Sequence, residues 1–192
     1  MKIGGYEIAP LTPDRWADFE TVLGRGGISG CWCMYWLTAT GREFEEGRRG
    51  GSTGANKAAF QKIVRGGAPG LLAYDGATPV AWVRVMPRMD HPGLRRSRLY
   101  GTAEDIAGIW SLSCFVIRRD WRGRGLSGVL IRAAIAHARD NGALTLEAYP
   151  NDTVEPSSPM ALYRGRASTF RRLGFVEVRR KAPQKPMMRF RL

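Results

Sequence analysis

Apolar positions cluster most clearly between residues 109 and 149, where their spacing changes twice. An apolar run over residues 109–117 predicts a buried strand. Residues 125–141 then carry apolar side chains at helical spacing and end at Asn141-Gly142, which predicts an amphipathic helix with a glycine stop. Another apolar stretch over residues 143–149 predicts the next strand. A strand, a helix and a strand with short connections form a parallel pair with a right-handed crossover.

Shorter segments with the same kinds of pattern fill the rest of the chain. The dipeptide Asp75-Gly76 separates two apolar runs and predicts a hairpin, and Thr12-Pro13 predicts a helix start. Further strands are expected over residues 6–9, 71–74, 79–85, 175–180 and 187–191, and further helices over residues 56–64 and 167–173. Loops are expected over residues 24–30, 47–54, 87–101 and 151–160. Without an internal repeat or a linker, residues 1–192 predict one α/β domain with a mixed central sheet and a C-terminal hairpin.

The turn between the predicted strand and helix is rich in glycine and arginine, with the sequence Arg122-Gly-Arg-Gly125. Glycine lets an oxyanion approach the backbone, and the N–H groups at a helix start carry partial positive charge. Arginine side chains form forked hydrogen bonds with phosphate. The turn therefore predicts a site for a diphosphate.

The segment Arg122-Gly-Arg-Gly-Leu-Ser127 resembles the R/Q-x-x-G-x-G/A signature of the GNAT superfamily of N-acyltransferases. The segment Phe170-Arg-Arg-Leu-Gly174-Phe175 resembles a second element of that family, an aromatic residue four positions before Gly-Phe. A glycine-rich turn also occurs in dinucleotide sites, but there it follows the first strand, whereas this turn lies in the middle of the chain. The resemblance covers residues 71–192.

This resemblance implies a GNAT-like fold whose parallel β-loop-α-β unit binds CoA. It implies that an amine attacks acyl-CoA directly and receives its acyl group, with acetyl as the expected group. It also implies that no metal takes part in this reaction. The diphosphate would bind at Arg122, Gly123, Arg124, Gly125, Leu126 and Ser127. Backbone amides of Phe115, Val116 and Ile117 would hold the pantetheine arm and the thioester oxygen, and Phe170 would complete the cofactor site.

Two residues depart from the family pattern. Ser127 replaces the usual final glycine or alanine, and its hydroxyl can donate to phosphate. Phe170 stands where many members carry the tyrosine that protonates the departing CoA thiolate, and a phenyl ring has no proton to give. Ser168 and Tyr163 are candidate acids in its place, and the alternatives are a water molecule or departure as the thiolate.

An amine must lose a proton during acyl transfer, which calls for a base. Glu147 is the best-placed carboxylate, because alternation puts it on one face of its strand with Tyr149. The alternative is a solvated or salt-bridged strand residue. Glu104 and Asp105 precede the earlier strand and would be either a loop pair or a base acting through water. His137 lies on the apolar face of its helix and is expected in the core.

Residues 31–36 combine aromatic rings with sulfur. One interpretation is a core segment; the other is a wall of the acceptor pocket, formed by Cys31, Trp32, Tyr35 and Trp36. A metal site is disfavoured, because Cys114, His91 and His137 are the remaining candidate ligands and none stands at ligand spacing.

The chain carries a formal net charge of +13, from 30 Lys and Arg against 17 Asp and Glu. Binding of CoA phosphates, together with an arginine-rich genome, is one explanation. An anionic acceptor such as an aminoacyl-tRNA is the other, although aromatic residues that could stack on bases are sparse near the arginine clusters. A function of another class also stays open, namely a non-catalytic RNA-binding module with a GNAT-like fold. Phe170 favours that module, and the intact turn at residues 122–125 favours the enzyme.

The 192 residues contain no apolar stretch long enough to span a bilayer and no secretory signal at the start, so no membrane partner is expected. Three sparse cysteines are typical of a reducing compartment, which predicts a cytoplasmic protein. The identity of the acceptor, the length of the acyl chain and the oligomeric state are left open, with a dimer among the candidates.

Overall fold

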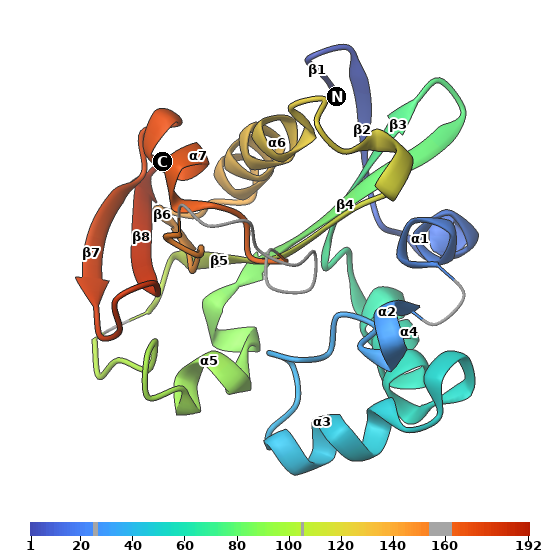
Figure 1. Ribbon diagram of the computed structural model, residues 1–192, viewed down its shortest axis with the longest axis horizontal. Coiled ribbons are helices and arrows are strands. Elements are labelled where there is room, and N and C mark those ends of the chain that lie inside the picture. The colour runs from blue at the N-terminus through green and yellow to red at the C-terminus, as the bar shows by residue number, and fades with distance from the viewer. Residues whose placement is uncertain (25–26, 105, 154–162) are drawn as a thin grey trace.

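A mixed eight-stranded sheet forms the centre of the computed structural model, which describes residues 1–24, 27–104, 106–153 and 163–192 (Figure 1). Its strands are β1 (Lys2–Ile3), β2 (Tyr6–Pro10), β3 (Gly70–Asp75), β4 (Thr78–Pro87), β5 (Ile109–Ile117), β6 (Thr145–Ala148), β7 (Val176–Arg180) and β8 (Pro186–Arg191). Their order across the sheet is β1-β2-β3-β4-β5-β6-β8-β7. The expected α/β class and the C-terminal hairpin, β7 with β8, are confirmed.

Helices cover both faces of this sheet. The α-helices are α1 (Trp16–Leu23), α2 (Gly27–Gly30), α3 (Gly41–Arg48), α4 (Ala55–Gly66), α5 (Pro92–Arg96), α6 (Leu126–Asp140) and α7 (Ala167–Arg172). Short 3-10 helices are η1 (Pro13–Arg15), η2 (Gly51–Thr53), η3 (Arg88–Asp90) and η4 (Arg119–Trp121). Figure 1 shows α6 and α7 on one side of the central strands and α1 to α4 on the other. Within the described ranges, no helix has both the length and the apolar character needed to cross a bilayer.

Alternation along the strands produces a separate apolar core on each face. Leu71 and Val83 point to the α6 side, where they join a core with α6 residues such as Leu130. Leu72 and Trp82 point to the opposite side and pack with residues of α1 and α4. The sheet is therefore buried on both faces, which keeps β4 and β5 rigid beneath any site built on them.

The parallel pair predicted from the sequence is confirmed as β5 and β6, connected by α6. These strands pair only over residues 109–112 and 145–148. Residues 113–117 of β5 continue beyond the end of β6, so the sheet is open on that side. Opposite Ser113, the register with β4 shifts between Arg84 and Val85, which is a bulge at the point where the strands separate.

Three α-helices fall outside the sequence predictions, and the first, α2, lies inside the loop expected over residues 24–30. α5 lies inside residues 87–101, which were expected to form a loop, and Pro92 occupies its first turn. α3 begins at a capping box in which Thr40 Oγ1 accepts from the Glu43 N–H at 3.0 Å and the Glu43 carboxylate accepts from the Thr40 N–H. This helix brings charged and aromatic side chains to the open edge of β5.

Candidate functional site

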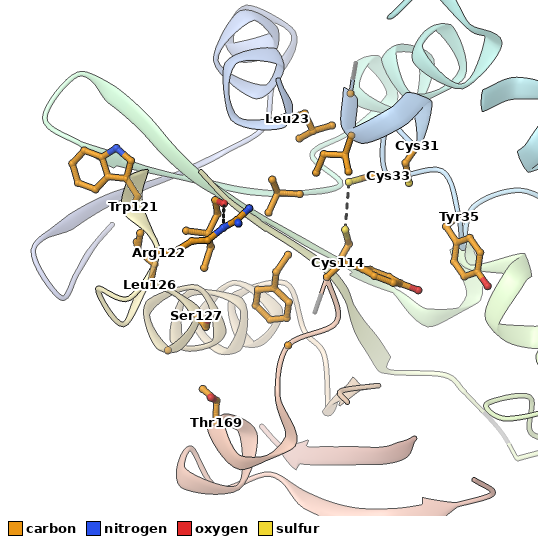
Figure 2. Close-up of a pocket in the computed structure, with 18 of the residues that line it drawn as sticks. Leu23, Cys31, Cys33, Tyr35, Cys114, Trp121, Arg122, Leu126, Ser127 and Thr169 are labelled. Atoms are coloured by element: carbon orange, nitrogen blue, oxygen red, sulfur yellow. Dashed lines mark hydrogen bonds between the residues drawn. The ribbon is translucent and has the colours of Figure 1, made fainter. Parts of the chain in front are cut away.

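A cavity of about 1040 Å³ lies beside the unpaired part of β5 (Figure 2). Its lining comes from five places: residues 114–117 of β5, the turn and the α6 residues that follow it, Tyr163 with Gly165, the face of α7, and Leu23 with residues between 27 and 48. A volume of this size is at the upper end of small-molecule pockets. Segments far apart in the sequence thus share one cavity, with different chemistry at its ends.

The first end is the glycine- and arginine-rich turn. Gly123 and Gly125 have left-handed φ values of +79° and +75°, which explains why glycine is needed there. Both line the cavity together with Leu126 and Ser127, where the N-terminus of the fifteen-residue α6 meets it. Backbone N–H groups at such a terminus attract anions.

Arginine side chains from three elements line the same cavity: Arg122, Arg132 and Arg172. Arg122 Nε donates to the Ile117 carbonyl oxygen at 3.2 Å, the dashed contact beside its label in Figure 2. Arg172 Nη2 donates to Thr169 Oγ1 at 3.3 Å. Arg132 and Arg172 were not predicted from the sequence. With Arg122 they make this end of the cavity suited to phosphate.

Arg124 lies elsewhere although it belongs to the same signature. Its guanidinium is 4.4 Å from the centre of the Trp121 ring, and its Nη2 donates to the Asp120 carbonyl oxygen at 3.3 Å. Among the described residues, it is absent from the cavity lining. The structure therefore separates two neighbouring arginines that the sequence treats alike.

The spacing of Gly123, Gly125 and Gly128 also fits the G-x-G-x-x-G pattern of dinucleotide loops. That loop belongs to doubly wound sheets built from several parallel strands. In the described part of this chain, β5 and β6 are the one parallel pair between named strands, within an otherwise antiparallel sheet. The topology therefore disfavours a dinucleotide fold.

The middle of the cavity is the open edge of β5. The Arg118 N–H donates to the Val80 oxygen on β4 at 3.1 Å. Because N–H directions alternate along a strand, the amides of Phe115 and Ile117 face the other way, toward the opening. The Phe115 N–H already donates to the Tyr163 carbonyl oxygen at 2.6 Å. Phe115, Val116 and Ile117 all line the cavity, as their predicted role requires.

At the second end, three thiols gather: Cys31, Cys33 and Cys114. Cys33 and Cys114 are hydrogen-bonded with their sulfurs 3.6 Å apart, and Trp82 Nε1 donates to Cys33 Sγ at 3.2 Å. Burial raises the pKa of Cys31 to about 11. The hydrogen bond with Cys114 lowers the pKa of Cys33 and raises that of Cys114. Across the described ranges, no three His, Cys, Asp or Glu side chains form a group that could hold a metal ion.

The four residues predicted to line the acceptor pocket divide into two pairs. Cys31 and Tyr35 line the cavity, and Tyr35 is 45% exposed. Trp32 and Trp36 are buried and outside the described lining. Trp32 donates from Nε1 to the Gly51 oxygen at 2.9 Å. Residues 31–36 therefore serve as both core and pocket wall, the two alternatives that the sequence left open.

α3 completes the cavity with residues that the sequence analysis missed. Glu45 and Arg48 line it and form an ion pair of 3.0 Å, and Phe44 packs its ring against Tyr35 at 5.2 Å. The pattern Thr40-x-x-Glu43 was the available signal, because a capping box marks a helix start.

Glu147 is fully buried and lies outside the described lining. Its carboxylate pairs with Arg88, accepts from Arg189 Nε at 2.8 Å, and accepts from the Tyr149 hydroxyl at 2.6 Å. Burial raises the pKa of Tyr149 well above its ordinary value. The expected proximity of Glu147 and Tyr149 is confirmed, within a network that joins β6, β8 and η3.

The candidate acids also lie in different places. Tyr163 lines the cavity, and burial raises the pKa of its phenol. Ser168 is exposed on α7 and outside the described lining. Phe170 is fully buried and packs edge-on against Phe115 and Phe175 at ring distances of 6.0 and 5.0 Å. Of these three positions, Tyr163 alone presents a proton donor to the cavity.

The other candidate residues, His137 and Glu104, contact protein side chains. His137 is half-buried against Trp110, with 5.7 Å between ring centres, and burial lowers its pKa. Glu104 pairs with Arg189 at 2.7 Å, which lowers the pKa of the Glu104 carboxyl. Asp105 lies outside the described residues.

Several arginines of the basic clusters already bind protein groups. Arg171 and Arg180 both pair with Asp152, at 2.7 and 2.6 Å. Arg96 donates to the Thr38 oxygen at 3.0 Å, and Arg164 lies over the ring of Tyr163. Part of the excess charge is thus used inside the fold.

Comparisons with known proteins lead to the same family that the turn at residues 122–127 resembles. The model of the acetyltransferase (GNAT) family matches residues 34–164. No curated protein sequence matches the chain. Among solved structures, the chain is similar to the PaiA N-acetyltransferase of Thermoplasma acidophilum in complex with coenzyme A, with 13% identity, 97% of this chain and 99% of that chain covered, and a TM-score of 0.54.

Two further solved structures are similar over almost the whole chain. YncA of Salmonella typhimurium, determined with acetyl-CoA, has 12% identity, coverage of 98% and 94%, and a TM-score of 0.56. The ribosomal-protein-alanine N-acetyltransferase of Brucella melitensis has 16% identity, coverage of 97% and 99%, and a TM-score of 0.55. At these identities the likeness concerns the fold.

Proposed function

The chain belongs to the acetyltransferase (GNAT) family and is an N-acyltransferase, and on that premise we propose that it transfers an acyl group from acyl-CoA, bound in the cavity beside α6, to an amine. One observation carries this proposal: a single cavity joins the turn at residues 122–127, the open edge of β5 and the thiol-lined end. An extended molecule with a diphosphate at one end and a thioester at the other fits that arrangement. The amine nitrogen bonds to the acyl carbon, the carbon–sulfur bond breaks, CoA leaves as its thiolate, and the nitrogen gives up one proton to water.

The phosphate end binds the diphosphate. The left-handed Gly123 and Gly125 leave the approach to α6 open, since nothing lies within 4 Å of the place where a Cβ would stand. Arg122 supplies a cation beside them, and Arg132 and Arg172 line the same cavity. Charge-assisted bonds of this kind are the strong ones in phosphate binding.

The open edge of β5 receives the pantetheine arm and the thioester. The Ile117 amide faces this edge, as strand alternation requires. The Phe115 N–H can donate to a thioester oxygen once the Tyr163 carbonyl releases it. A backbone donor aimed at the developing oxyanion lowers the barrier to attack.

Tyr163 is the group we assign to the departing sulfur in place of the missing family tyrosine. A phenol is protonated at neutral pH and burial raises the pKa of Tyr163 further, so its hydroxyl donates a hydrogen bond to the sulfur and keeps its proton. Glu147 is assigned a different role: its carboxylate is held by Arg88, Arg189 and Tyr149 away from the cavity, so it holds the sheet together.

The acceptor approaches the end formed by Tyr35 and α3. Tyr35 is exposed there, beside the ion pair of Glu45 and Arg48. This surface suits an amine on a small molecule or at the end of a chain. The aminoacyl-tRNA acceptor remains a prediction from charge, because arginines such as Arg171 and Arg180 are engaged with Asp152.

Replacing Arg122 with alanine is expected to weaken acetyl-CoA binding about ten- to a hundredfold, the usual effect of losing a hydrogen bond to a charged group. The same change at Arg124 should alter the dissociation constant less than about twofold, since its guanidinium covers Trp121. Isothermal titration calorimetry measures both constants. Equal losses in the two variants, or an unchanged constant for Arg122→Ala, would remove Arg122 from the phosphate site.

A further inference from the structure

One part of the cavity wall presents apolar and thiol side chains without a charged group. In the described lining it comes from the end of α1, the segment that follows α1, and β5. We call this part the apolar lobe, and its residues are Leu23, Ile28, Cys31, Cys33, Cys114 and Val116. All six belong to the apolar core on the α1 side of the sheet or pack against it. Free cysteine behaves as a small apolar side chain, so the lobe suits a hydrocarbon.

The apolar lobe lies next to the place assigned to the thioester. Phe115, whose amide is assigned to the thioester oxygen, stands between Cys114 and Val116. Alternation along β5 sends the Phe115 side chain into the core on the α6 side, and sends Cys114 and Val116 to the α1 side. The carbon chain of an acyl group held at Phe115 therefore has the apolar lobe beside it.

The backbone of two lobe residues is strained and held by its neighbours. Ile28 and Cys33 have left-handed φ of +50° and +58°, and such a value is a genuine outlier for a β-branched residue like Ile28. The Cys33 carbonyl oxygen accepts from the buried guanidinium of Arg84, and the N–H of the buried Trp32 donates to the Gly27 oxygen at 3.1 Å. Strain persists where surrounding contacts fix it, and it gathers at ligand sites. These contacts fix the shape of the lobe before a ligand arrives.

The apolar lobe is also shielded from solvent. Leu23, Cys33, Cys114 and Val116 are buried, whereas Tyr35 is 45% exposed. Figure 2 shows Leu23, Cys33 and Cys114 close to one another, with Tyr35 to their right. A hydrocarbon placed in the lobe loses its contact with water, and the end formed by Tyr35 and α3 is left for the amine. An acetyl group has one methyl to place there.

We propose that the apolar lobe binds the hydrocarbon part of the acyl group, and that the protein selects acyl-CoA with a chain longer than acetyl, in the range from butanoyl to octanoyl. This inference rests on the proposed function and names its class of acyl group. The reaction is unchanged: the amine attacks the acyl carbon directly, and Tyr163 keeps its role at the departing sulfur. The resemblance implies acetyl as the expected group, whereas the lobe favours a longer one.

The expected preference follows from the burial of methylene groups. Each methylene moved from water into an apolar site strengthens binding about fourfold. Butanoyl-CoA has two more methylenes than acetyl-CoA, so its dissociation constant should be lower by up to about sixteenfold. Hexanoyl-CoA and octanoyl-CoA should gain further until the lobe is full.

Calorimetric titration of the full chain with CoA and with its acetyl, butanoyl, hexanoyl and octanoyl thioesters tests this preference. The dissociation constant should fall from acetyl-CoA to butanoyl-CoA. The heat-capacity change of binding should become more negative with chain length, because more apolar surface is buried. Equal dissociation constants for acetyl-CoA and the longer thioesters would overturn the inference and leave the proposed function standing. Failure of every thioester to bind would overturn the proposed function itself.

A matched pair of substitutions locates the preference in the apolar lobe. Leu23→Phe places a larger side chain in the lobe, so the ratio of the acetyl-CoA to the hexanoyl-CoA dissociation constant should fall toward one. Leu37→Phe makes the same change against the same core but outside the described lining, and it should keep the wild-type ratio. Overpacking destabilises both variants, so urea unfolding checks that each is folded during titration. A wild-type ratio in folded Leu23→Phe would contradict the assignment of the lobe to the acyl chain.

Discussion

Gly125→Val is expected to abolish acetyl-CoA binding while the chain stays folded. Gly125 has φ of +75° and forms the N-cap of α6. A left-handed conformation costs an L-residue about 1–2 kcal/mol, and a β-branched side chain disfavours it further. Nothing lies within 4 Å of the added Cβ, so the change acts through the backbone and the turn must rearrange. The N–H groups that bind the diphosphate then lose their alignment.

Gly76→Val is the matched control for this substitution. Gly76 also has left-handed φ, at +53°, with open space around the Cβ position, and it lies in the hairpin between β3 and β4. Both variants should lower the free energy of unfolding by similar amounts in urea titrations. Only Gly125→Val should weaken the binding of acetyl-CoA. The dissociation constant should rise by at least about a hundredfold if two hydrogen bonds to phosphate are lost. Wild-type affinity in Gly125→Val would show that the cosubstrate binds elsewhere.

Glu147→Ala is expected to cost about 3–5 kcal/mol of the free energy of unfolding, the usual penalty for removing one partner of a buried ion pair. Arg88 would then stay buried with its anionic partner missing, since the side chains of Arg88 and Glu147 are 2% and 0% exposed. The Tyr149 hydroxyl would lose the carboxylate that accepts its proton at 2.6 Å. Urea unfolding of the variant and the parent measures the difference.

Glu104→Ala is the control, because it removes the exposed end of the same network. The Glu104 side chain is 49% exposed where it pairs with Arg189 at 2.7 Å. Exposed pairs contribute about 0–1 kcal/mol, so the loss should be small. Comparable losses in the two variants would contradict the structural role of Glu147. A stable Glu147→Gln variant with reduced turnover and an altered acid limb would return Glu147 to the base role predicted from the sequence.

The unit of β5, α6 and β6 could be predicted closely because its signals are local. The apolar run gave β5 at its observed bounds, Ile109–Ile117, and Gly142, with φ of +77°, stands just beyond the end of α6 as a glycine stop should. The turn at residues 122–125 was predicted for the same reason, since a helix start and its glycines are adjacent in sequence. Local pattern is sufficient where neighbours in sequence decide the structure.

The rest of the site depends on contacts that sequence distance hides. Alternation placed Glu147 beside Tyr149, but Arg88 is 59 residues away and its pairing with Glu147 arises only in the folded chain. Arg122 and Arg124 are of one type and two positions apart, yet Arg122 lines the cavity, whereas Arg124 stacks on Trp121 and is absent from the described lining. Residue type and spacing alone carry no information on such choices.

The thiols are another example of contacts that the sequence does not reveal. Cys33 and Cys114 are 81 residues apart, and the fold of residues 31–36 over β5 brings their sulfurs together. From the sequence, Cys114 was a disfavoured metal ligand and Cys33 belonged to a segment expected as core or pocket wall. The hydrogen bond from Trp82 to Cys33 has no sequence signal. Contacts of this kind arise only from the tertiary fold.

The central claim is that this chain holds acyl-CoA in the cavity beside α6. Calorimetric titration of the wild-type chain with acetyl-CoA tests it most directly. We predict saturable binding of one acetyl-CoA per chain, with a dissociation constant between about 1 μM and about 1 mM, the usual range for enzyme substrates, and weaker binding as salt screens the arginines. Absence of saturable binding at millimolar acetyl-CoA, with the chain folded, would contradict the account.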